Sequence, residues 1–368
     1  MVRSKILFYM PALLGGGAER VWALLATAFA RMGHEVVFVV DYVAAENQAF
    51  LDPAIRQITL PAGHLGAVLG LWRVLRHEKP DVSLSGLGVA NLKHMLAALA
   101  CGRHRRAIIS FHGFFASENR FLSRLGNHLA PVLTRLCGRA IAVSDGLRNA
   151  LISRHGASAL RTVRVYNPVF SPAEMLAVVA SELAARPARV LFVGRMHPDK
   201  DLPTLIRAFA ALKYPDTVLE LVGDGPQRKI LESQVLQLGL ANRVNFSGYL
   251  ADPTDAYQRS RLLVLTSRLE SFGNVIAEGL AHGLPVVSTA SAGPIEILDH
   301  GRFGTLVPIG DHLALADAID ASLADPGDPA ARIARAAEFS IENATSAYSA
   351  LIEKVMAEAN RSHGGKVT

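Results

Sequence analysis

Short runs of apolar, often β-branched residues recur along the chain, separated by longer stretches with apolar residues at helical spacing. In the first half these runs span residues 5–10, 35–41, 81–85, 107–110 and 140–144. The pattern restarts after Pro168, with runs at residues 189–194, 218–223, 244–248, 262–266 and 285–288. Polar and apolar residues do not alternate within the runs, which therefore predict strands buried on both faces of parallel sheets.

The stretches between these runs predict helices. Residues 18–32 carry apolar side chains at helical spacing. Residues 202–213 follow Asp201, a suitable N-cap, and place Pro203 in the first helical turn. This alternation of strands and helices favours an α/β protein built from two doubly wound units, one after the other.

Two segments outside these units have their own patterns. Residues 168–188 are expected to form a linker that contains a helix at 172–183. Residues 340–359 are expected to form a closing helix, and the last nine residues a frayed polar tail.

Length and charge divide the chain at the same place. A chain of 368 residues fits two domains, which we place at residues 1–168 and 169–344, with a helix at about 345–360 packing back on the first. Residues 1–168 contain 20 Lys and Arg against 9 Asp and Glu, a net charge of +11, whereas the rest contain 18 against 23. This asymmetry indicates a boundary near Asn167 and an anionic partner for the first domain.

Composition narrows the class of protein. Half the residues are apolar and 7% are aromatic, as in globular chains, and no uncharged apolar run reaches the roughly 18 residues that span a bilayer. Residues 1–14 are interpreted as a first strand rather than a signal peptide, because Pro11 interrupts the apolar stretch. Cys101 and Cys137 show no metal-binding spacing, so we expect reduced thiols and a cytoplasmic location.

Glycine-rich turns follow three of the predicted strands, at residues 14–20, 193–195 and 222–226. The first precedes a helix, whose N-terminal N–H groups can bind an anion. It is not a dinucleotide-binding fingerprint, because Arg20 stands where the last small residue should be. Each turn by itself is equally compatible with simple chain reversal.

A sharper cluster covers residues 266–278, from the end of a strand into a helix that is expected to begin near Gly273. Glu270 lies at the carboxyl end of the sheet, where open α/β folds bind ligands, and Glu278 lies inside the helix. Carboxylates accept hydrogen bonds from sugar hydroxyls, while the amides of Gly273, Asn274 and Val275 can contact a pyrophosphate. A helix cap with solvated glutamates is the alternative.

Three further side chains are candidates for the same chemistry. Arg195 and Lys200 follow the first strand of the second unit and can neutralise a diphosphate leaving group, with surface ion pairs as the alternative. His112 ends a strand of the first unit between aromatic residues and glycine, which suits an active site as well as a structural histidine.

The order of these motifs resembles the retaining glycosyltransferases of the GT-B fold that carry the E-x7-E signature (glycosyl transferases group 1, family 4-like). The resemblance covers nearly the whole chain and rests on segments 15–19, 111–113, 142–144, 193–195 with Lys200, 222–226, 270–275 with Glu278, 283–287, 293–296 and 304–307. It implies two Rossmann-like domains facing each other across a cleft that holds the nucleotide and the sugar.

The resemblance also implies roles for individual residues. His112 and Glu270 would contact the donor sugar and are the predicted catalytic residues. The predicted donor-binding residues are Gly16, Gly17, Arg195, Lys200, Gly223, Phe272, Gly273, Asn274, Val275 and Glu278. Among them, Arg195 and Lys200 would contact the pyrophosphate, Glu278 the ribose, and the Gly16–Gly17 loop would lie near the phosphates.

The expected reaction is transfer of a hexose or N-acetylhexosamine, with retention of configuration, from a nucleotide diphosphate sugar, which we expect to be a UDP-sugar. The expected acceptor is a lipid-linked or cell-surface polysaccharide or glycolipid. Asp199-Lys200-Asp201 formally matches the D-x-D metal motif of another transferase fold. The GT-B fold normally works without a catalytic metal, so we expect no cofactor and no essential metal.

Other functions remain open. A nicotinamide-dependent dehydrogenase would need the missing fingerprint, although Asp41 follows the second strand. A sugar-nucleotide 2-epimerase would share the fold, but the E-x7-E signature that Glu270 and Glu278 match in this chain argues against it. A non-catalytic partner protein of the same fold is the third alternative.

The basic first domain is also expected to dock on an anionic membrane surface, on the inner face of the cell membrane. Residues 117–137 can form an amphipathic helix, kinked at Pro131. The apolar side would carry Phe121, Leu122, Leu125, Leu129, Val132, Leu133 and Leu136. Within residues 93–139 a single acid, Glu118, accompanies eight cations: Lys93, Arg103, Arg105, Arg106, Arg120, Arg124, Arg135 and Arg139. Packing of this stripe on the sheet is the alternative, and nucleic acid is not expected as a partner, because stacking aromatics are missing.

Overall fold

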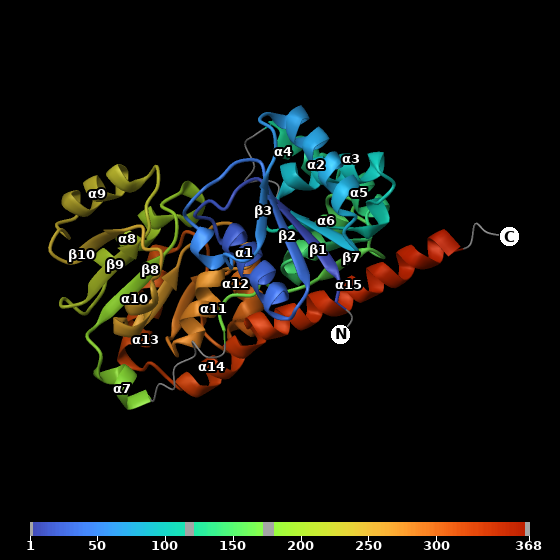
Figure 1. Cartoon of the computed structure of the whole chain (residues 1–368). Coiled ribbons are helices and arrows are strands. Elements are labelled where there is room, and N and C mark those ends of the chain that lie inside the picture. The colour runs from blue at the N-terminus through green and yellow to red at the C-terminus, as the bar shows by residue number, and fades with distance from the viewer. Residues whose placement is uncertain (1–2, 115–120, 172–179, 365–368) are drawn as a thin grey trace. The chain divides into compact units, whose positions relative to one another are not determined.

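The computed structural model describes residues 3–114, 121–171 and 180–364, with the side chains of 121–123 and 362–364 left out (Figure 1). The chain divides into two compact units. The first contains Met1–Pro168 and Ile341–Thr368, and the second contains Val169–Ser340. The last helix therefore belongs to the first unit although it ends the chain.

The first unit is built on a parallel sheet with seven strands among the described residues, in the order β3-β2-β1-β4-β5-β6-β7. The strands are β1 (Lys5–Met10), β2 (Glu35–Val40), β3 (Arg56–Thr59), β4 (Val82–Gly86), β5 (Ala107–Phe111), β6 (Arg139–Ala142) and β7 (Thr162–Arg164). The strand order reverses between β1 and β4, which makes the carboxyl ends of these two strands the topological switch point.

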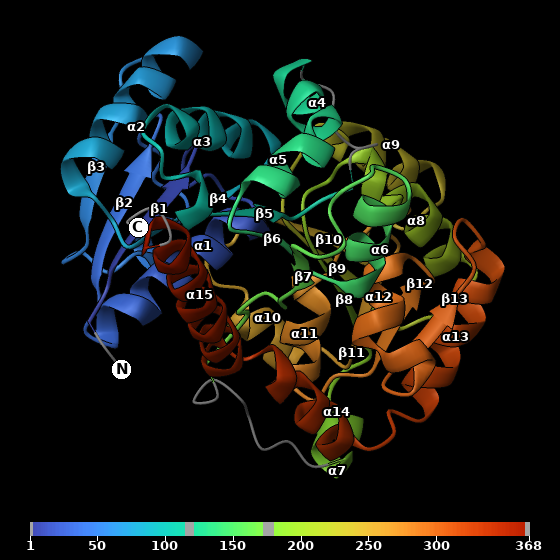
Figure 2. The ribbon, with the colours of Figure 1, turned by 90° about the vertical axis from the view of Figure 1, so that its right-hand side faces the viewer.

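Helices cover both faces of this sheet. They are α1 (Gly17–Arg31), α2 (His64–Glu78), α3 (Gly88–Ala100), α4 (Phe121–His128), α5 (Ala130–Leu136), α6 (Asp145–Ser153) and α15 (Ile341–Gly364). Because crossovers are right-handed, α1 and α2 lie on opposite faces. Helix α15 packs on α1 (Figure 2), and both contribute to one core with β1, in which Phe8, Trp22, Phe29 and Tyr348 are buried.

The second unit repeats the design with six parallel strands among the described residues, in the order β10-β9-β8-β11-β12-β13. The strands are β8 (Arg189–Val193), β9 (Val218–Val222), β10 (Val244–Gly248), β11 (Leu262–Leu265), β12 (Val286–Thr289) and β13 (Thr305–Val307). The helices are α7 (Ala180–Ala185), α8 (Leu202–Ala210), α9 (Arg228–Gln237), α10 (Thr254–Arg259), α11 (Asn274–Ala281), α12 (Ala292–Ile297), α13 (His312–Ala324) and α14 (Pro329–Ala336). Here the strand order reverses between β8 and β11.

These two sheets confirm the predicted α/β fold class with doubly wound parallel sheets. Every predicted central strand is present, whereas β3, β7 and β13 were not predicted. All three are edge strands of three or four residues that are only partly buried, so their sequences lack a continuous apolar run. Edge strand β10 is likewise buried on one face only.

Three predicted helices differ from the structure. The helix expected at 117–137 is two helices, α4 and α5, because Pro131 lies in the first turn of α5 and cannot continue a helix from α4. The closing helix continues to Gly364, so the residues expected to form a tail are helical as far as they are described. Of the helix expected at 172–183, only the part from Ala180 lies within the described residues. In the part of the chain that the structure describes, no helix combines the length and apolarity needed to cross a membrane.

Candidate active site

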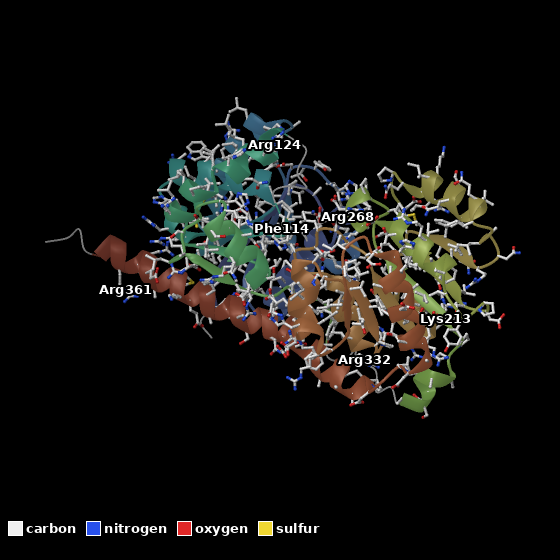
Figure 3. The ribbon with its side chains drawn as sticks, turned by 180° about the vertical axis from the view of Figure 1, so that it is seen from behind. Phe114, Arg124, Lys213, Arg268, Arg332 and Arg361 are labelled. Atoms are coloured by element: carbon white, nitrogen blue, oxygen red, sulfur yellow. The ribbon has the colours of Figure 1, made fainter. Side chains whose placement is uncertain are left out.

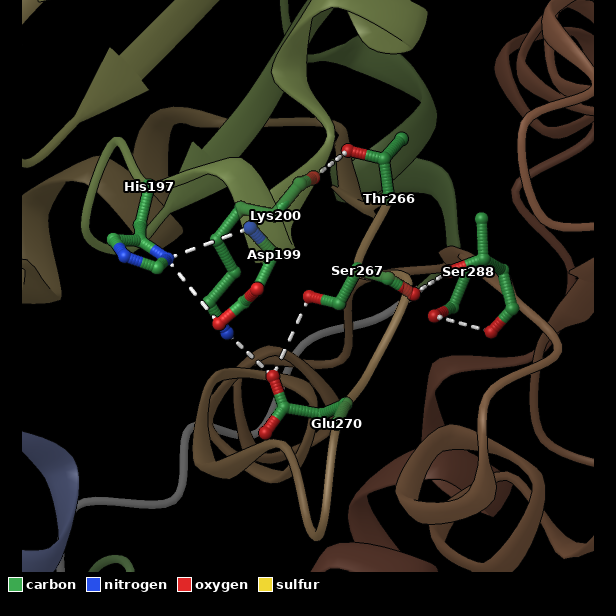
Figure 4. Close-up of polar contacts among 8 residues, drawn as sticks. His197, Asp199, Lys200, Thr266, Ser267, Glu270 and Ser288 are labelled. Carbon is green, nitrogen blue, oxygen red and sulfur yellow. Dashed lines mark hydrogen bonds and ion pairs between the residues drawn. The ribbon is translucent and has the colours of Figure 1, made fainter. Parts of the chain in front are cut away.

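The candidate site of the second unit lies at the switch point between β8 and β11. The loop after β8 carries Arg195 and Lys200, and the loop after β11 carries Glu270. Two hydrogen bonds join these loops. Thr266 Oγ1 donates to the Lys200 carbonyl at 2.7 Å (Figure 4), and the Arg268 N–H donates to the Asp199 carbonyl at 2.8 Å. Ligands of open α/β sheets bind in the crevice at such a place.

Lys200 and Glu270 form an ion pair across this switch point, with 2.5 Å between Nζ and Oε2 (Figure 4). Both side chains keep contact with solvent, being 24% and 14% exposed. The Ser267 hydroxyl donates a longer hydrogen bond of 3.4 Å to the same carboxylate oxygen. The sequence predicted both residues, and the structure brings them together.

Backbone packing fixes the position of Glu270. The Gly293 N–H donates to the Glu270 carbonyl at 2.9 Å. A side chain at position 293 would collide with the backbone of Phe272, so only glycine allows α12 to approach this loop so closely. The Phe272 ring is buried and packs edge-on against Phe339, with 5.6 Å between ring centroids. The ring of this predicted donor-binding residue therefore anchors the loop from inside the core.

Helix α11 follows this loop and carries Glu278. Gly273, with a φ of 98°, takes the left-handed conformation before the helix, which begins with Asn274 and Val275. The Glu278 carboxylate is buried and accepts a hydrogen bond of 2.5 Å from the Tyr257 hydroxyl. Tyr257 in turn stacks on His282. Tyr257 and His282 escaped sequence analysis because neither belongs to a motif.

The glycine turns after β8 and β9 touch each other. A Cβ atom on Gly223 would overlap the Gly194 carbonyl, and one on Gly225 would overlap the backbone of Met196. The Gly194 N–H donates to the Val222 carbonyl at 2.9 Å. These glycines are therefore required by the close approach of two loops at the carboxyl edge. Arg195, beside them, is exposed.

The predicted capping role of Asp201 is wrong. Asp201 occupies the N-cap position of α8, but its backbone is left-handed (φ 46°) rather than extended as in most N-caps, and its side chain makes no capping hydrogen bond. Its carboxylate instead forms a 3.0 Å ion pair with Arg268. Asp199, the other acid of the D-x-D match, lies 3.2 Å from His197 Nδ1. Among the described residues, no group of His, Cys, Asp and Glu is arranged to hold a metal ion.

In the first unit, the predicted phosphate-binding loop lies at the switch point between β1 and β4. Gly16 precedes α1, and Gly17 is the first residue of this helix. The Asn47 side chain, buried under the loop, donates to the carbonyls of Leu14 and Gly16, the latter at 3.0 Å. Asn47 lies in an irregular segment, where sequence alone gave no signal.

His112 follows β5 and is half-buried. Its Nε2 atom lies 2.9 Å from the indole nitrogen of Trp22 on α1 and 3.0 Å from Ser110 Oγ. Burial lowers the pKa of His112 to about 4, so the imidazole is uncharged at neutral pH. The structure thus places the two predicted catalytic residues, His112 and Glu270, on different units, each at the carboxyl edge of its own sheet.

Two family models match the chain and together cover most of it. Residues 15–170 match the model "Glycosyltransferase Family 4", and residues 179–339 match the model "Glycosyl transferases group 1". A lipopolysaccharide core biosynthesis glycosyltransferase of Rhizobium meliloti, LpsE, is 29% identical over 324 residues, which are 84% of this chain and 86% of that one.

Solved structures with the same fold agree. A glycosyltransferase from Rickettsia africae aligns over 97% of this chain and 99% of its own, with a TM-score of 0.80 and 19% identity. The Anabaena protein HepE, in complex with UDP-glucose, aligns over 98% of this chain and 100% of its own, with a TM-score of 0.76 and 25% identity. The chain is therefore a glycosyltransferase that belongs to the GT-B superfamily of glycosyl transferases group 1.

Proposed function

We propose that this glycosyltransferase moves a hexose or N-acetylhexosamine from a UDP-sugar to a saccharide or lipid-linked acceptor, with retention of configuration. The Lys200–Glu270 pair carries the proposal, because it places a cation and a sugar-hydroxyl acceptor side by side at the switch point of a nucleotide-binding type of sheet. Lys200 and Arg195 bind the diphosphate, Glu270 binds the donor sugar, and Glu278 binds the ribose. His112 contacts the sugar, and the Gly16–Gly17 loop binds near the phosphates.

In the proposed reaction, the bond between the anomeric carbon and the β-phosphate oxygen breaks, and a bond to the acceptor oxygen forms on the same face. The acceptor proton passes to the departing phosphate oxygen. Lys200 and Arg195 stabilise the negative charge that grows on this leaving group. An enzymic nucleophile is not needed.

A structural neighbour supports UDP as the nucleotide, and a relative supports an N-acetylhexosamine as a candidate sugar. HepE is solved with UDP and with UDP-glucose, and a Campylobacter jejuni relative, 26% identical over 336 residues, is an N-acetyl-D-galactosaminyltransferase. The deciding experiment incubates the protein with a panel of UDP- and GDP-sugars, with and without lipid-linked saccharide acceptors, and measures nucleoside diphosphate. Acceptor-dependent release of UDP supports the proposal, and the anomeric configuration of the product, determined by NMR, tests retention.

The same assay separates the alternatives. Formation of the 2-epimer of the donor without acceptor would identify an epimerase. Failure to bind any nucleotide sugar, measured as thermal stabilisation, would favour a non-catalytic partner protein, because a bound ligand stabilises the folded state by RT ln(1 + [L]/Kd).

We propose further that the first unit docks on an anionic membrane, where a lipid-linked acceptor would reside. Leu125 on α4 and Val132 on α5 are exposed, next to the exposed Arg124 (Figure 3) and Arg135. The sequence pattern predicted these residues, but Leu133 points into the core. Two of the eight predicted cations, Lys93 and Arg139, are buried in ion pairs with Asp41 and Glu358 and are unavailable to lipid headgroups.

Helix α3 neighbours both α2 and α4, and helices α2 and α3 add apolar residues that the sequence did not single out. Leu65 is 73% exposed and Leu69 46% on α2, while Leu96 and Leu99 are exposed on α3. Arg73 and Arg76 are exposed on α2. Exposed leucines with flanking arginines are typical of surfaces that dock on anionic bilayers.

Catalysis is proposed to be independent of a metal ion. Both carboxylates of the D-x-D match already have partners: Asp199 has His197 and Asp201 has Arg268. We expect turnover to be unchanged after removal of divalent metals with excess EDTA. A loss of activity that Mg²⁺ or Mn²⁺ restores would contradict this prediction.

A further inference from the structure

The Trp22 side chain occupies an unusual place for an indole: its N–H points at the ring of a predicted catalytic histidine. Trp22 is fully buried on α1 and packs edge-on against Phe8, with 5.4 Å between ring centroids. Its Nε1 atom lies 2.9 Å from His112 Nε2. An indole nitrogen can only donate, so His112 Nε2 must accept.

We infer that Trp22 is a positioning residue that holds His112 as the neutral tautomer, with its proton on Nδ1 and its Nε2 lone pair occupied, so that the histidine is uncharged and oriented when a donor binds. The consequence for catalysis rests on the proposed function, since it requires that His112 contacts the donor sugar. The tautomer itself does not depend on that function.

A hydroxyl group provides a second donor for the same nitrogen. Ser110 Oγ lies 3.0 Å from His112 Nε2. Because the indole N–H makes Nε2 an acceptor, the Ser110 hydroxyl can only donate to it.

The surroundings of the ring oppose a positive charge. Two uncharged side chains, Trp22 of α1 and Ser110 of β5, contact the ring, and Tyr348 of α15 interacts with Ser110. Burial raises the pKa of Tyr348, which keeps the phenol neutral, and burial lowers the pKa of His112 to about 4. A proton on Nε2 would face the indole N–H of Trp22, which cannot accept it.

The β4 strand leaves space for the indole. Gly86 ends β4, and a Cβ atom at this position would overlap Trp22 Nε1. The position of the indole N–H is thus determined by β1 on one side, β4 on another and His112 at its tip. Such close packing makes the donor rigid, which is what selection of one tautomer requires.

The test replaces Trp22 by Phe, which keeps an aromatic ring and removes the N–H. With ¹⁵N-labelled histidine, NMR of the wild-type chain is expected to show His112 protonated on Nδ1 at neutral pH. In Trp22→Phe we expect a mixture of tautomers and a pKa of His112 raised by about one unit, the loss of one hydrogen bond to the neutral form. Ser110→Ala should act in the same direction, and Ser110→Thr, which keeps the hydroxyl, should restore the wild-type state.

A matched control is Phe38→Leu, which disturbs the same core through the Phe8 ring without touching His112. It should leave the tautomer and the pKa of His112 unchanged. In the transferase assay, the acid limb of the turnover–pH profile is expected to move to higher pH in Trp22→Phe and to stay in Phe38→Leu.

Three results would overturn the inference. A wild-type His112 that is protonated on Nε2 contradicts the inferred tautomer. Unchanged His112 resonances and an unchanged His112 pKa in Trp22→Phe contradict the role of Trp22. If Trp22→Phe does not fold, the same measurements on Ser110→Ala decide. An NMR shift without any change in the pH profile overturns the catalytic consequence alone. Absence of transfer with every donor, together with the expected NMR result, contradicts the proposed function and leaves the tautomer supported.

Discussion

Lys200 and Glu270 neutralise each other in an ion pair at the switch point of the second sheet. A bound donor would have to contact both side chains while they also contact each other. A partly exposed ion pair of this kind contributes only about 0.2–1 kcal/mol to stability. Variants of either residue should therefore fold, and under the proposed function the pair places two side chains where a diphosphate and a sugar would meet.

Glu270→Gln tests the carboxylate. If Glu270 binds the sugar more strongly in the transition state, turnover should fall by a factor of about 10²–10³, while the free energy of unfolding barely changes. Steady-state kinetics with the best donor, together with chemical denaturation, measures both.

Glu338→Gln is the matched control for this variant. Glu338 is an exposed carboxylate of the second unit, 2.7 Å from Arg335, and belongs to none of the predicted site positions. It should keep wild-type turnover. Wild-type turnover in Glu270→Gln as well would remove Glu270 from the site.

Lys200→Ala and Arg195→Ala test the cations. Each should weaken binding of UDP more than binding of UMP, because both cations are proposed to face the second phosphate. Calorimetric titration with the two nucleotides gives the two affinities. Replacement of Lys213 (Figure 3) by Ala removes a surface ion pair with Asp317 in the same unit and should affect neither affinity. Equal losses for UDP and UMP would place the cations elsewhere.

At the scale of elements, the exposed apolar residues of the first unit lie on four helices, α2 to α5, rather than on the one amphipathic helix that the sequence predicted. The pattern of residues 117–137 predicted one apolar side along a single helix. The chain instead breaks before α5, and of the predicted apolar residues Leu133 is buried whereas Leu125 and Val132 are exposed. Helices α2 and α3 carry further exposed leucines outside the predicted segment. Residues 115–120, the beginning of the predicted helix, lie outside the described residues.

The double variant Leu65→Ser/Leu69→Ser should lower co-sedimentation of the protein with vesicles that contain phosphatidylglycerol, and Arg124→Glu/Arg135→Glu should lower it further at low salt. The physical reason is loss of apolar burial in the first case and of electrostatic attraction, about 1 kcal/mol per cation, in the second.

The second unit supplies a control for this experiment. Leu236 and Leu313 are 68% and 60% exposed there, on a unit with excess negative charge, so Leu236→Ser/Leu313→Ser should leave vesicle binding unchanged. Binding that is independent of vesicle charge, or no binding by the wild-type chain, would contradict docking on an anionic membrane.

At the scale of the whole molecule, buried ionisable groups make the fold sensitive to acid. Burial lowers the pKa of His94 to about 3, and the Arg56 guanidinium lowers the pKa of Glu78 to about 2. A histidine that stays neutral in the folded state contributes stability that is complete above the unfolded pKa of 6.5 and is lost as the pH falls. The carboxylate contributes stability present above 4.5 and lost as the pH falls toward 2.

We therefore expect the free energy of unfolding to fall as the pH drops below about 6.5, at first through histidines. His94 alone should account for roughly 2 kcal/mol between about pH 6.5 and about pH 4.5. Urea denaturation of His94→Gln should show a smaller loss over this range. His64→Gln, at an exposed histidine of the same unit, should behave like the wild type, and an equal loss in all three would mean that His94 is not the cause.

The sequence specified the central strands and the alternation of strands with helices, because buried strands need continuous apolar runs and helices need a 3.6-residue period. It did not reveal β3, β7 or β13, whose few residues are half-solvated at the edges of the sheets. Motif order also led to the family and to Lys200 and Glu270 as candidates. The assignment of the predicted site residues to their roles remains a prediction.

Contacts between segments distant in sequence were decided only by the tertiary structure. Tyr257 is 21 residues from the Glu278 carboxylate that it contacts, and Trp22 is 90 residues from His112. Asp201 looked like a cap in sequence, but its left-handed backbone and its ion pair with Arg268 gave it another role. Periodicity and turn chemistry are local and can be read along the chain. Partner choice, burial and the tautomer of a histidine depend on which segments the sheet order brings together, and a single sequence does not contain that order explicitly.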